Sequence, residues 1–510
     1  MNLKHGELKK MIKKLKNNIT LLNVITNLIL QICTIASGFI IPKIILIYFG
    51  SEVNGLVSSI TQFLSYISLI EGGVTGVITA NLYKPLCDRD TKKISSIIKT
   101  TNKFYRKIGI IFIIYSIILA IIYPIVFDVN FSYVFVFTLT IILSMNLLIQ
   151  YMFSLTLKTL LNADKKVYVV AISQTLMIVC NIILAIISVK IYPSIHLLKL
   201  ITGILYITQP IIYQSYIKKH YELIKDAEED TDLIKSRWNG FAINIAAFIH
   251  FSTDITILTL FTDLSTVSIY SVYALVTTGL RQIVSSIASA INPAIGQLYA
   301  RGDKEELNKK FDIYEYIIFM IVFLLFTVAG LLITPFVMIY TKDITDANYY
   351  QPLFGILLII SEGLYLIKFP HLNLAYAANK FKQITVPSFI EAILNIVISL
   401  ILVQRLGLIG VAIGTIVAMI YRMAFHVYYT KKEIIDRAQF KFYKSFIIFS
   451  IATLIGIFIC VYIIPSVKYT IMSWILHGIV YTIIMSALYL IISMLCYKRE
   501  IQFFLRKDKL

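Results

Sequence analysis

Two cationic side chains interrupt long apolar stretches of the sequence and could hold an anion there. Arg281 lies about halfway between Asp263 and Arg301, so its side chain cannot easily reach either end of its stretch. A guanidinium fork matches phosphate oxygens, so Arg281 is predicted to face a cavity and bind an anionic group; the alternative is an ion pair between helices. Lys368 is a weaker second candidate for substrate binding, because its long stem could reach an interface. Glu362 is about 600° of helical rotation away from Lys368, so these two side chains do not share a face.

Carboxylates in apolar stretches are candidates for coupling to an ion gradient, because charge is costly there. His250 and Asp254 are spaced four residues apart and therefore lie on one helix face. A histidine beside a carboxylate could carry a proton or hold a cation; the alternative is a polar pair that packs two parts of the protein together. The further ion-coupling candidates are Glu71, Glu362 and Glu391.

A neutral polar stripe precedes these charged positions in the sequence. Asn23, Asn27 and Gln31 recur every four residues and so lie on one helix face. Such a stripe suits sugar hydroxyl groups or water in a substrate cavity. Hydrogen bonding between helices is the alternative explanation.

Motifs of the common enzyme classes are absent from the sequence. It contains no GxxxxGK[ST], HExxH or GxSxG pattern, so neither a P-loop nor a familiar hydrolase site is expected. Asp88-Arg89-Asp90 lies in a lysine-rich loop, where solvated charge explains it better than a metal site. The five cysteines show no CxxC spacing. The sequence therefore predicts no catalytic residue, no bound metal and no cofactor.

Composition places these residues in a membrane. The chain is 58% hydrophobic and 15% charged, whereas soluble proteins carry roughly 25% charged residues. Apolar stretches such as 108–127 match the roughly 20 residues that cross a bilayer as a helix, and they are too long for barrel strands. Division at charged and turn-rich breaks predicts an all-α protein of about 14 membrane helices. Lys43 and Arg422 lie nearer the helix ends and are expected to extend to the interface.

The distribution of Lys and Arg predicts the topology. Most of the 47 Lys and Arg residues fall in the two tails and in alternate loops, densely at 84–107, 218–237, 431–444 and 498–509. Because positive charge marks the cytoplasmic side, both termini are expected in the cytoplasm and the number of helices is even. The net charge of +19 is then a topology signal, assisted by anionic lipid headgroups, and requires no nucleic-acid partner.

The sequence repeats itself at an offset of about 214 residues. Asn81-Leu82-Tyr83 matches Gln297-Leu298-Tyr299, and Asn181-Ile182-Ile183-Leu184 matches Asn395-Ile396-Val397-Ile398; chance similarity among apolar helices is the alternative. A six-helix unit crosses the membrane an even number of times, so two copies would be parallel, related by a pseudo-twofold axis along the membrane normal. The predicted parts are a basic cytoplasmic tail (1–18), an N-terminal lobe (19–217), a cytoplasmic linker (218–236), a C-terminal lobe (237–430), and two more helices with a basic tail (431–510).

One segment carries a family resemblance. Pro42–Leu86, with the sequence PKIILIYFGSEVNGLVSSITQFLSYISLIEGGVTGVITANLYKPL, is similar to the first two helices of polysaccharide transporters, the Wzx-type flippases of the MOP exporter superfamily. A short outer turn is followed there by a glycine-rich bend, here Gly72-Gly73. The parallel six-plus-six arrangement with two extra helices also resembles this MATE/MOP-like fold.

The resemblance implies a transporter rather than an enzyme. It implies movement of undecaprenyl-diphosphate-linked oligosaccharide units across a bacterial cytoplasmic membrane for surface polysaccharide, coupled to an ion. The expected partners are the lipid-linked substrate, membrane lipids, and the glycosyltransferases and polymerase of the same pathway. A MATE-type multidrug exporter and a lipid II flippase are alternatives within the class. A membrane-embedded glycosyltransferase or polymerase is the alternative outside it, disfavoured because the expected outer loops, such as 50–53 and 404–406, are short.

Overall fold

The protein is all-helical in the part that the structure describes. The computed structural model describes residues 19–71, 73–127, 130–224, 226–230, 248, 252–498 and 500, and these contain no strand. Twelve of their helices are long and apolar enough to cross a membrane. One of the twelve, Ile19–Glu71, covers two expected crossings, and the shorter apolar helix Ser252–Phe261 lies at the seventh. The expected all-helical membrane fold is therefore confirmed, and the helix count is roughly as expected.

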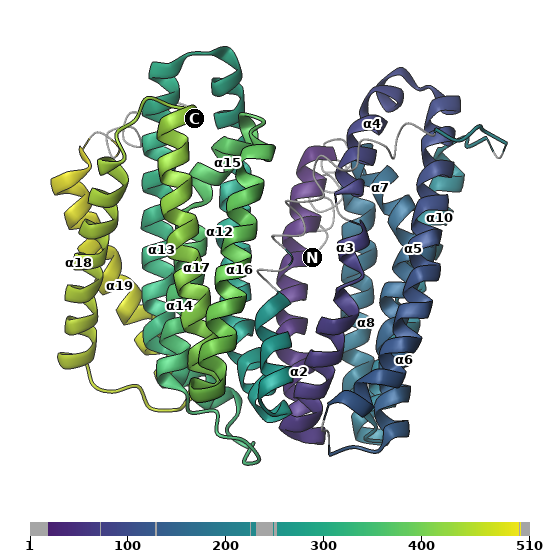
Figure 1. Cartoon of the computed structure of the whole chain (residues 1–510), viewed down its shortest axis with the longest axis horizontal. Helices are drawn as coiled ribbons and strands as arrows, with labels where there is room; N and C mark the ends of the chain where they lie inside the picture. Colours follow the sequence, from purple (N-terminus) through teal and green to yellow (C-terminus); the bar gives the residue numbers. More distant parts are fainter. Residues whose placement is uncertain are drawn as a thin grey trace, which may run out of the picture. The chain divides into compact units, whose positions relative to one another are not determined.

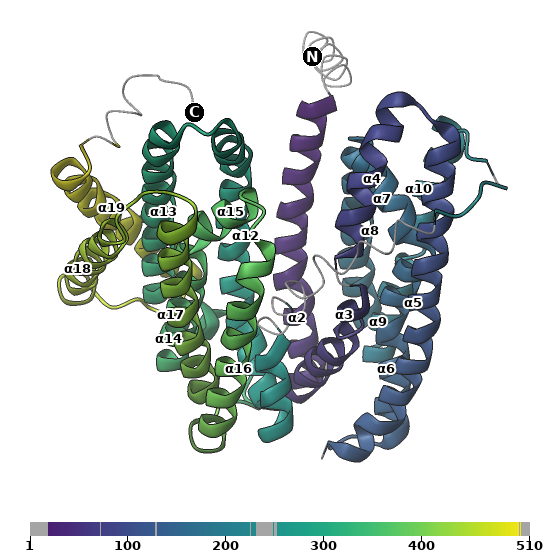
Figure 2. The same cartoon turned by 45° about the horizontal axis from the view of Figure 1, so that its top comes forward.

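The chain divides into two compact units, unit 1 (Met1–Ile245) and unit 2 (Ala246–Leu510). The helices of unit 1 are α2 (Ile19–Ser65), α3 (Ser68–Glu71), α4 (Val74–Asp88), α5 (Thr91–Val126), α6 (Tyr133–Ile149), the π-helix η1 (Gln150–Ser154), α7 (Leu155–Ala163), α8 (Val167–Ile191), α9 (Ile195–Leu205) and α10 (Thr208–His220). Figure 1 and Figure 2 show α5 and α6 side by side in this unit. The parallel repeat between the two units stays a prediction.

Two glycines divide the N-terminal helices. Gly50 has φ 81° and ψ 177° inside α2, a conformation that side chains with a Cβ rarely adopt. Gly73, with φ 78°, precedes the first residue of α4. The predicted bend after Glu71 is thus present, and it leaves Glu71 at the end of the short helix α3.

Unit 2 contains the residues that carry most of the candidate site. Its helices are Ser252–Phe261, α12 (Leu264–Arg301), α13 (Lys304–Tyr340), α14 (Pro352–Ile367), α15 (Phe369–Ala377), α16 (Phe381–Leu406), α17 (Leu408–Glu433), α18 (Phe440–Tyr462) and α19 (Ile471–Cys496). A Cβ on Gly414 of α17 would overlap Ser399 Oγ of α16. Such close packing of small residues is how membrane helices associate without a hydrophobic driving force.

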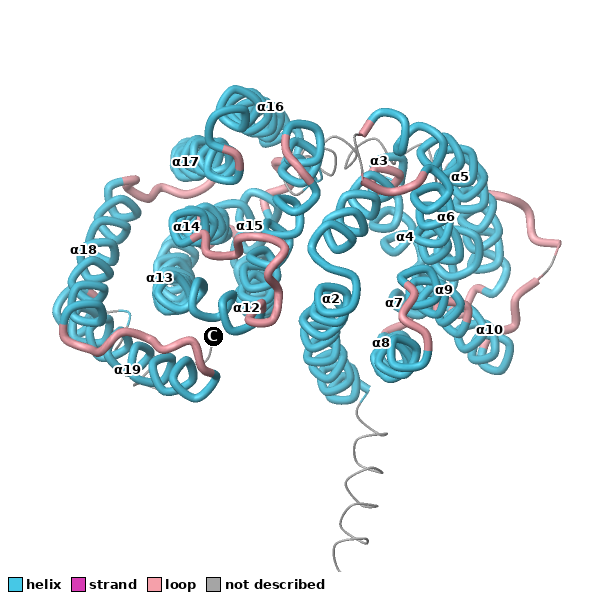
Figure 3. The backbone as a smooth tube through the Cα atoms, turned by 90° about the horizontal axis from the view of Figure 1, so that it is seen from below, coloured by secondary structure: helices cyan, strands magenta, loops and turns pink. Residues whose placement is uncertain are grey.

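The last two helices pack on the outside of unit 2. Figure 3 looks along the helices and shows α18 and α19 beside α13, away from α16 and α17. Polar contacts fasten them: Tyr316 donates to Ser493 Oγ over 2.7 Å, and the Trp474 indole donates to the Leu332 carbonyl over 3.2 Å. The polar interior described next therefore belongs to α12–α17 and the helix Ser252–Phe261.

Candidate functional site

Asp254 is a buried carboxylate held by neutral donors. Its side chain accepts a hydrogen bond from the Tyr270 hydroxyl over 2.9 Å, and the Thr415 hydroxyl lies 3.3 Å from the same oxygen. Asn395 donates to Thr415 Oγ1 over 3.3 Å. Asp254 is 5% exposed and Asn395 is 1% exposed. Four helices therefore converge on this carboxylate.

The Asp254 cluster is built almost entirely from oxygen atoms. Ser399 donates to Asn395 Oδ1 over 3.2 Å, and the Thr415 hydroxyl lies 3.1 Å from the Val411 carbonyl. Carboxylate, hydroxyl, amide and carbonyl oxygens are the ligands that hard cations prefer. No cation from the described residues forms an ion pair with Asp254, and no group of three or more His, Cys, Asp or Glu that could hold a metal occurs among them. The arrangement therefore suits a proton or a small monovalent cation.

Arg281 pairs with Glu362 within the membrane. Its Nη1 lies 2.7 Å from Glu362 Oε1, and its Nη2 donates to Thr278 Oγ1 over 3.3 Å. The side chains of Arg281 and Glu362 are 23% and 14% exposed, so the pair is partly accessible. Glu362 Oε2 is buried and has no hydrogen-bond partner among the described residues. The ion pair that was the alternative explanation for Arg281 is present, and anion binding by Arg281 stays a prediction.

Lys368 is buried at the break between α14 and α15. The residue is 2% exposed, its Nζ lies 4.3 Å from the centroid of the Tyr365 ring, and it contacts Met419 Sδ at 3.7 Å. No carboxylate of the described chain lies within ion-pair distance of this amine. Lys368 therefore does not reach an interface in this conformation, and its role in substrate binding stays a prediction.

Arg422 does not extend to the interface, contrary to expectation. It is 5% exposed, and its Nε lies 3.3 Å from Glu391 Oε2 and 2.8 Å from His426 Nε2. The distance explains the error: at 1.5 Å per residue, Arg422 is about 16 Å from the end of α17. Glu391, an ion-coupling candidate, is thus the counter-charge of Arg422.

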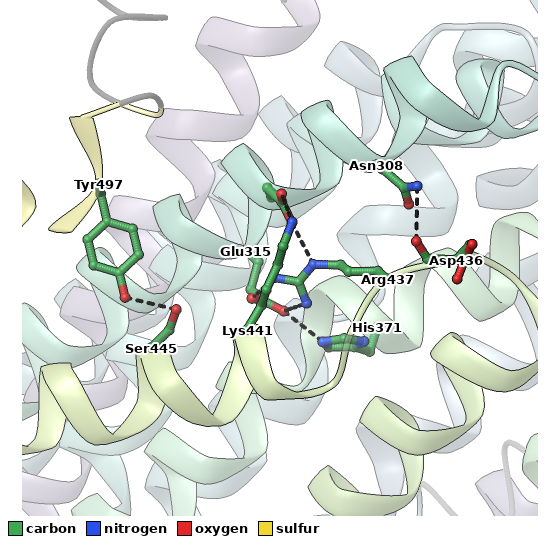
Figure 4. A network of polar contacts seen from close by, with 9 residues as sticks. Asn308, Glu315, His371, Asp436, Arg437, Lys441, Ser445 and Tyr497 are labelled. Carbon is green, nitrogen blue, oxygen red and sulfur yellow. Dashed lines mark hydrogen bonds and ion pairs between the residues drawn. The ribbon is translucent and has the colours of Figure 1, made fainter.

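A second buried network fastens the segment between α17 and α18 (Figure 4). Both terminal nitrogens of Arg437 contact the Glu315 carboxylate, at 2.5 and 3.1 Å, and His371 Nε2 lies 2.8 Å from the same carboxylate. Arg437 and Lys441 share Asp312. Burial lowers the pKa of Arg437, but the charges of Glu315 and Asp312 outweigh burial and raise the pKa above its ordinary value. The guanidinium therefore stays charged, and the network joins α13, α15 and the loop before α18.

Glu71 is the ion-coupling candidate in unit 1. Thr75 donates to its Oε1 over 2.5 Å, and Tyr151 of the π-helix η1 donates to its Oε2 over 3.3 Å. Thr75 also contacts the Tyr105 hydroxyl at 2.6 Å. Glu71 is half-buried at the helix break, so its carboxylate is partly solvated.

One residue of the neutral polar stripe on α2, Asn23, contacts the start of another helix. The Asn23 amide donates to the Lys165 carbonyl over 2.9 Å and accepts from the Tyr168 backbone over 2.8 Å, which caps the start of α8. Asn27 donates to the Asn23 carbonyl over 3.0 Å, within its own helix. Gln31 is exposed. The residue expected beside Asp254, His250, lies outside the described residues.

Several polar partners were not anticipated from the sequence. Tyr270 and Thr415 gave no signal, because tyrosine and threonine occur throughout the apolar stretches. Glu315 and His371 could have been found, since each is a titratable residue in an apolar stretch.

The helix arrangement of this chain resembles that of solved membrane transporters. No profile of a protein family matches the sequence, and no curated protein matches it. Among solved structures, a lipid II flippase MurJ in an inward closed conformation aligns with a TM-score of 0.70 at 16% identity, over 92% of this chain and 99% of that one. An inward-facing multidrug resistance MATE family transporter of the MOP superfamily aligns with a TM-score of 0.60 at 14% identity, over 78% and 93%. The chain therefore has the fold of these membrane transporters.

Proposed function

We propose that this chain is a flippase for undecaprenyl-diphosphate-linked oligosaccharide units, moving them from the inner to the outer leaflet for surface polysaccharide biosynthesis. The supporting observation is the partly exposed Arg281 in the middle of α12, a helix of 38 residues. The Arg281 side chain is 23% exposed, so its guanidinium is accessible to a second anionic group beside Glu362. Arg281 can therefore share its charge with a diphosphate that crosses a region where charge is costly.

The extent of the fold supports a flippase over a drug exporter. The MurJ structure aligns over 92% of this chain and the MATE transporter over 78%. The charges agree with this choice, because Lys368 adds a buried cation to the neutral Arg281–Glu362 pair. With Asp254 assigned to ion coupling, the two cations Arg281 and Lys368 favour an anionic substrate over a cationic drug.

The Asp254 cluster is proposed as the coupling site. A buried carboxylate without a counter-charge is costly. Binding a proton or a monovalent cation lowers this cost, and Tyr270, Thr415 and Asn395 supply the surrounding polar groups. Glu362 and Glu391 have cationic partners, and Glu71 is only half-buried, so Asp254 is the preferred candidate.

The proposed location is a bacterial cytoplasmic membrane with both termini in the cytoplasm. The charge distribution supports this orientation. Single cysteines at two exposed positions, Lys92 and Lys468, test it. Lys468 should label from outside intact cells, and labelling of Lys92 from outside would overturn the orientation.

A charge exchange tests the substrate role of Arg281. Arg281→Ala alone leaves Glu362 unpaired and lowers stability, so it cannot separate binding from folding. The double variant Arg281→Glu with Glu362→Arg keeps the ion pair but moves the cation to the other helix. Transport should be lost although the protein is present at the wild-type level. The measurements are surface polysaccharide and the accumulation of undecaprenyl-linked glycan inside the cell.

The controls separate the two roles of the pair. Arg405→Ala removes an exposed arginine at the end of α16 and should transport normally. Full transport by the charge-exchanged variant would show that only the pair matters, and would refute Arg281 as the diphosphate ligand.

The MurJ alignment makes lipid II transport the second candidate. Lipid II and the oligosaccharide units share the polyprenyl diphosphate, so Arg281 would serve either. Depletion of the protein distinguishes them: loss of surface polysaccharide with intact cell wall favours the first, and loss of cell-wall synthesis the second.

A further inference from the structure

Unit 1 contains a groove separate from the buried charges. A cavity of about 390 Å³ lies between α5, the η1–α7 segment and α10. Its walls are largely apolar, and Phe153 and Ile211, which are 54% and 57% exposed, are among the residues that line it. Four polar side chains with hydrogen-bond donors also line it: Asn102, Arg106, Thr156 and Gln214. The groove therefore combines an apolar surface with a cationic and amide-bearing rim.

Arg106 is the cation of this groove. It is exposed, and no acidic partner for it occurs among the described residues. Its neighbours on α5 are engaged elsewhere: Lys99 donates to the Ala227 carbonyl over 2.9 Å, and Lys103 pairs with Glu229 at 2.8 Å. Arg106 is thus available to a ligand that enters the groove.

The π-helix shapes the floor of the groove. Met152 and Phe153 belong to η1, and such single-turn π-helices interrupt α-helices frequently at functional sites. Gly109 of α5 lets Met152 pack closely, since a Cβ at Gly109 would lie 2.5 Å from Met152 Sδ. The apolar floor is therefore set by backbone geometry as well as by side chains.

The position of the groove in the membrane matches a lipid headgroup. The apolar stretch of α5 begins at Ile108, so Arg106 lies where the chain enters the membrane. Gln214 lies one turn before Lys218 and Lys219 at the end of α10. This basic side is predicted to face the cytoplasm, where anionic lipids concentrate and basic pockets between helices bind their headgroups.

We propose that this groove is a binding site for an anionic phospholipid. The phosphate contacts Arg106 with Asn102 and Gln214 beside it, and an acyl chain lies along Met152, Phe153 and Ile211. The groove is a site for a membrane lipid that stabilises unit 1, distinct from the transported substrate. A lipid that binds the folded protein and not the unfolded chain raises the stability of the protein.

Lipid titration of the purified full-length protein tests the proposal. The probes are phosphatidylglycerol and phosphatidylcholine with the same acyl chains, and the readouts are bound lipid by native mass spectrometry and the Tm. Phosphatidylglycerol should bind more tightly and raise Tm. Arg106→Gln should weaken its binding roughly tenfold, the effect of losing a hydrogen bond to a charged group. Ile211→Trp should also weaken binding, because it narrows the groove and leaves the charge intact.

Lys107→Gln is the matched control. Lys107 is the next residue along α5, exposed and basic, and does not line the groove, so this variant should bind phosphatidylglycerol as the wild type does. Any of three results would overturn the proposal. Lys107→Gln could lose as much affinity for phosphatidylglycerol as Arg106→Gln, the wild type could bind phosphatidylcholine as tightly as phosphatidylglycerol, or Arg106→Gln could bind phosphatidylglycerol as the wild type does. Displacement of the lipid by inorganic phosphate would indicate a phosphate site instead, and tighter binding of undecaprenyl phosphate would indicate the substrate's tail.

Discussion

The two units place their charges differently. In unit 2 the ion pair of Arg437 with Glu315 is almost fully buried, with side chains 6% and 3% exposed. In unit 1 the described ion pairs lie on the surface, as in Lys103–Glu229, with side chains 54% and 34% exposed. Buried pairs are costly to break, whereas surface pairs contribute little. Of the described ion pairs, the buried ones of unit 2 therefore contribute more to the structure than those of unit 1.

The two units also differ in how deeply one carboxylate of each is buried. Asp254 in unit 2 and Glu71 in unit 1 each have one tyrosine and one threonine hydroxyl beside them. Asp254 is 5% exposed, whereas Glu71 is half-buried at a helix break. The donors are alike and the solvation is not, so burial of the carboxylate costs more at Asp254 than at Glu71.

The largest expected effect on stability is at Glu315. Glu315→Gln removes one of the two carboxylates that face the buried Arg437 and leaves only Asp312, which should lower the free energy of unfolding by about 3 kcal/mol, the low end of the cost of breaking a buried pair. Thermal unfolding in detergent measures it. Glu305→Gln is the control on the same helix, because Glu305 pairs with Lys309 on the surface, with side chains 81% and 58% exposed. Equal effects of the two variants would remove the contrast between buried and surface pairs.

The dependence of transport on an ion gradient should distinguish Asp254 from Glu71. Asp254→Asn keeps the shape of the side chain and removes the charge that a proton or cation would neutralise. Transport by this variant should lose its dependence on ion gradients, while Glu71→Gln should keep that dependence. The measurement is transport into vesicles with and without an imposed gradient of protons or of sodium. An unchanged dependence in Asp254→Asn would make its cluster structural only.

A smaller effect is expected on the stability of unit 1. Glu71→Gln replaces one carboxylate oxygen, a hydrogen-bond acceptor, by an amide NH2, which is a donor. At most one of the hydrogen bonds from Thr75 and Tyr151 therefore needs to be lost. The free energy of unfolding should fall by about 1 kcal/mol, the usual contribution of a hydrogen bond. A loss as large as that of Glu315→Gln would show that Glu71 is as tightly enclosed as the buried pairs of unit 2.

The fold could be predicted from the sequence because lipid leaves the chain few choices. A backbone in hydrocarbon must form helices or a closed barrel, and apolar stretches of this length leave helices. The length of these stretches and the distribution of Lys and Arg then indicate roughly where the helices lie. The bend after Glu71 was also predictable, because glycine permits the φ of 78° found at Gly73.

The candidate site was predictable only where charge made a residue conspicuous. Arg281 and Asp254 could be singled out as candidates because charge is rare in apolar stretches. Their partners depend on which helices meet, which one sequence does not reveal. Arg422 was assigned wrongly for the same reason, since its pairing with Glu391 requires α16 and α17 to pack closely.

The smallest expected effect is at the surface contacts of α5. The segment after α10 lies along this helix: the Ile224 backbone donates to Ser95 Oγ over 2.9 Å, and the Asp230 backbone donates to Thr100 Oγ1 over 2.7 Å. The hydrogen bond from Lys103 lowers the pKa of Glu229 below its ordinary value of 4.5. A lowered pKa means that the contact stabilises the folded form above pH 4.5 and loses this contribution as the pH falls through the lowered pKa.

Because backbone contacts also hold this segment, Glu229→Gln should change only its local opening. Hydrogen exchange at Asp230 should be modestly faster in Glu229→Gln than in the wild type at neutral pH and low salt. The difference should shrink at high salt, which screens exposed charges, and at a pH low enough to protonate Glu229. Thr100→Val is the comparison variant: it removes the acceptor of the Asp230 backbone and should speed exchange regardless of salt. If the faster exchange in Glu229→Gln persists unchanged in high salt, side-chain shape rather than charge holds the segment. The contrast between surface and buried charges would then not apply to Glu229.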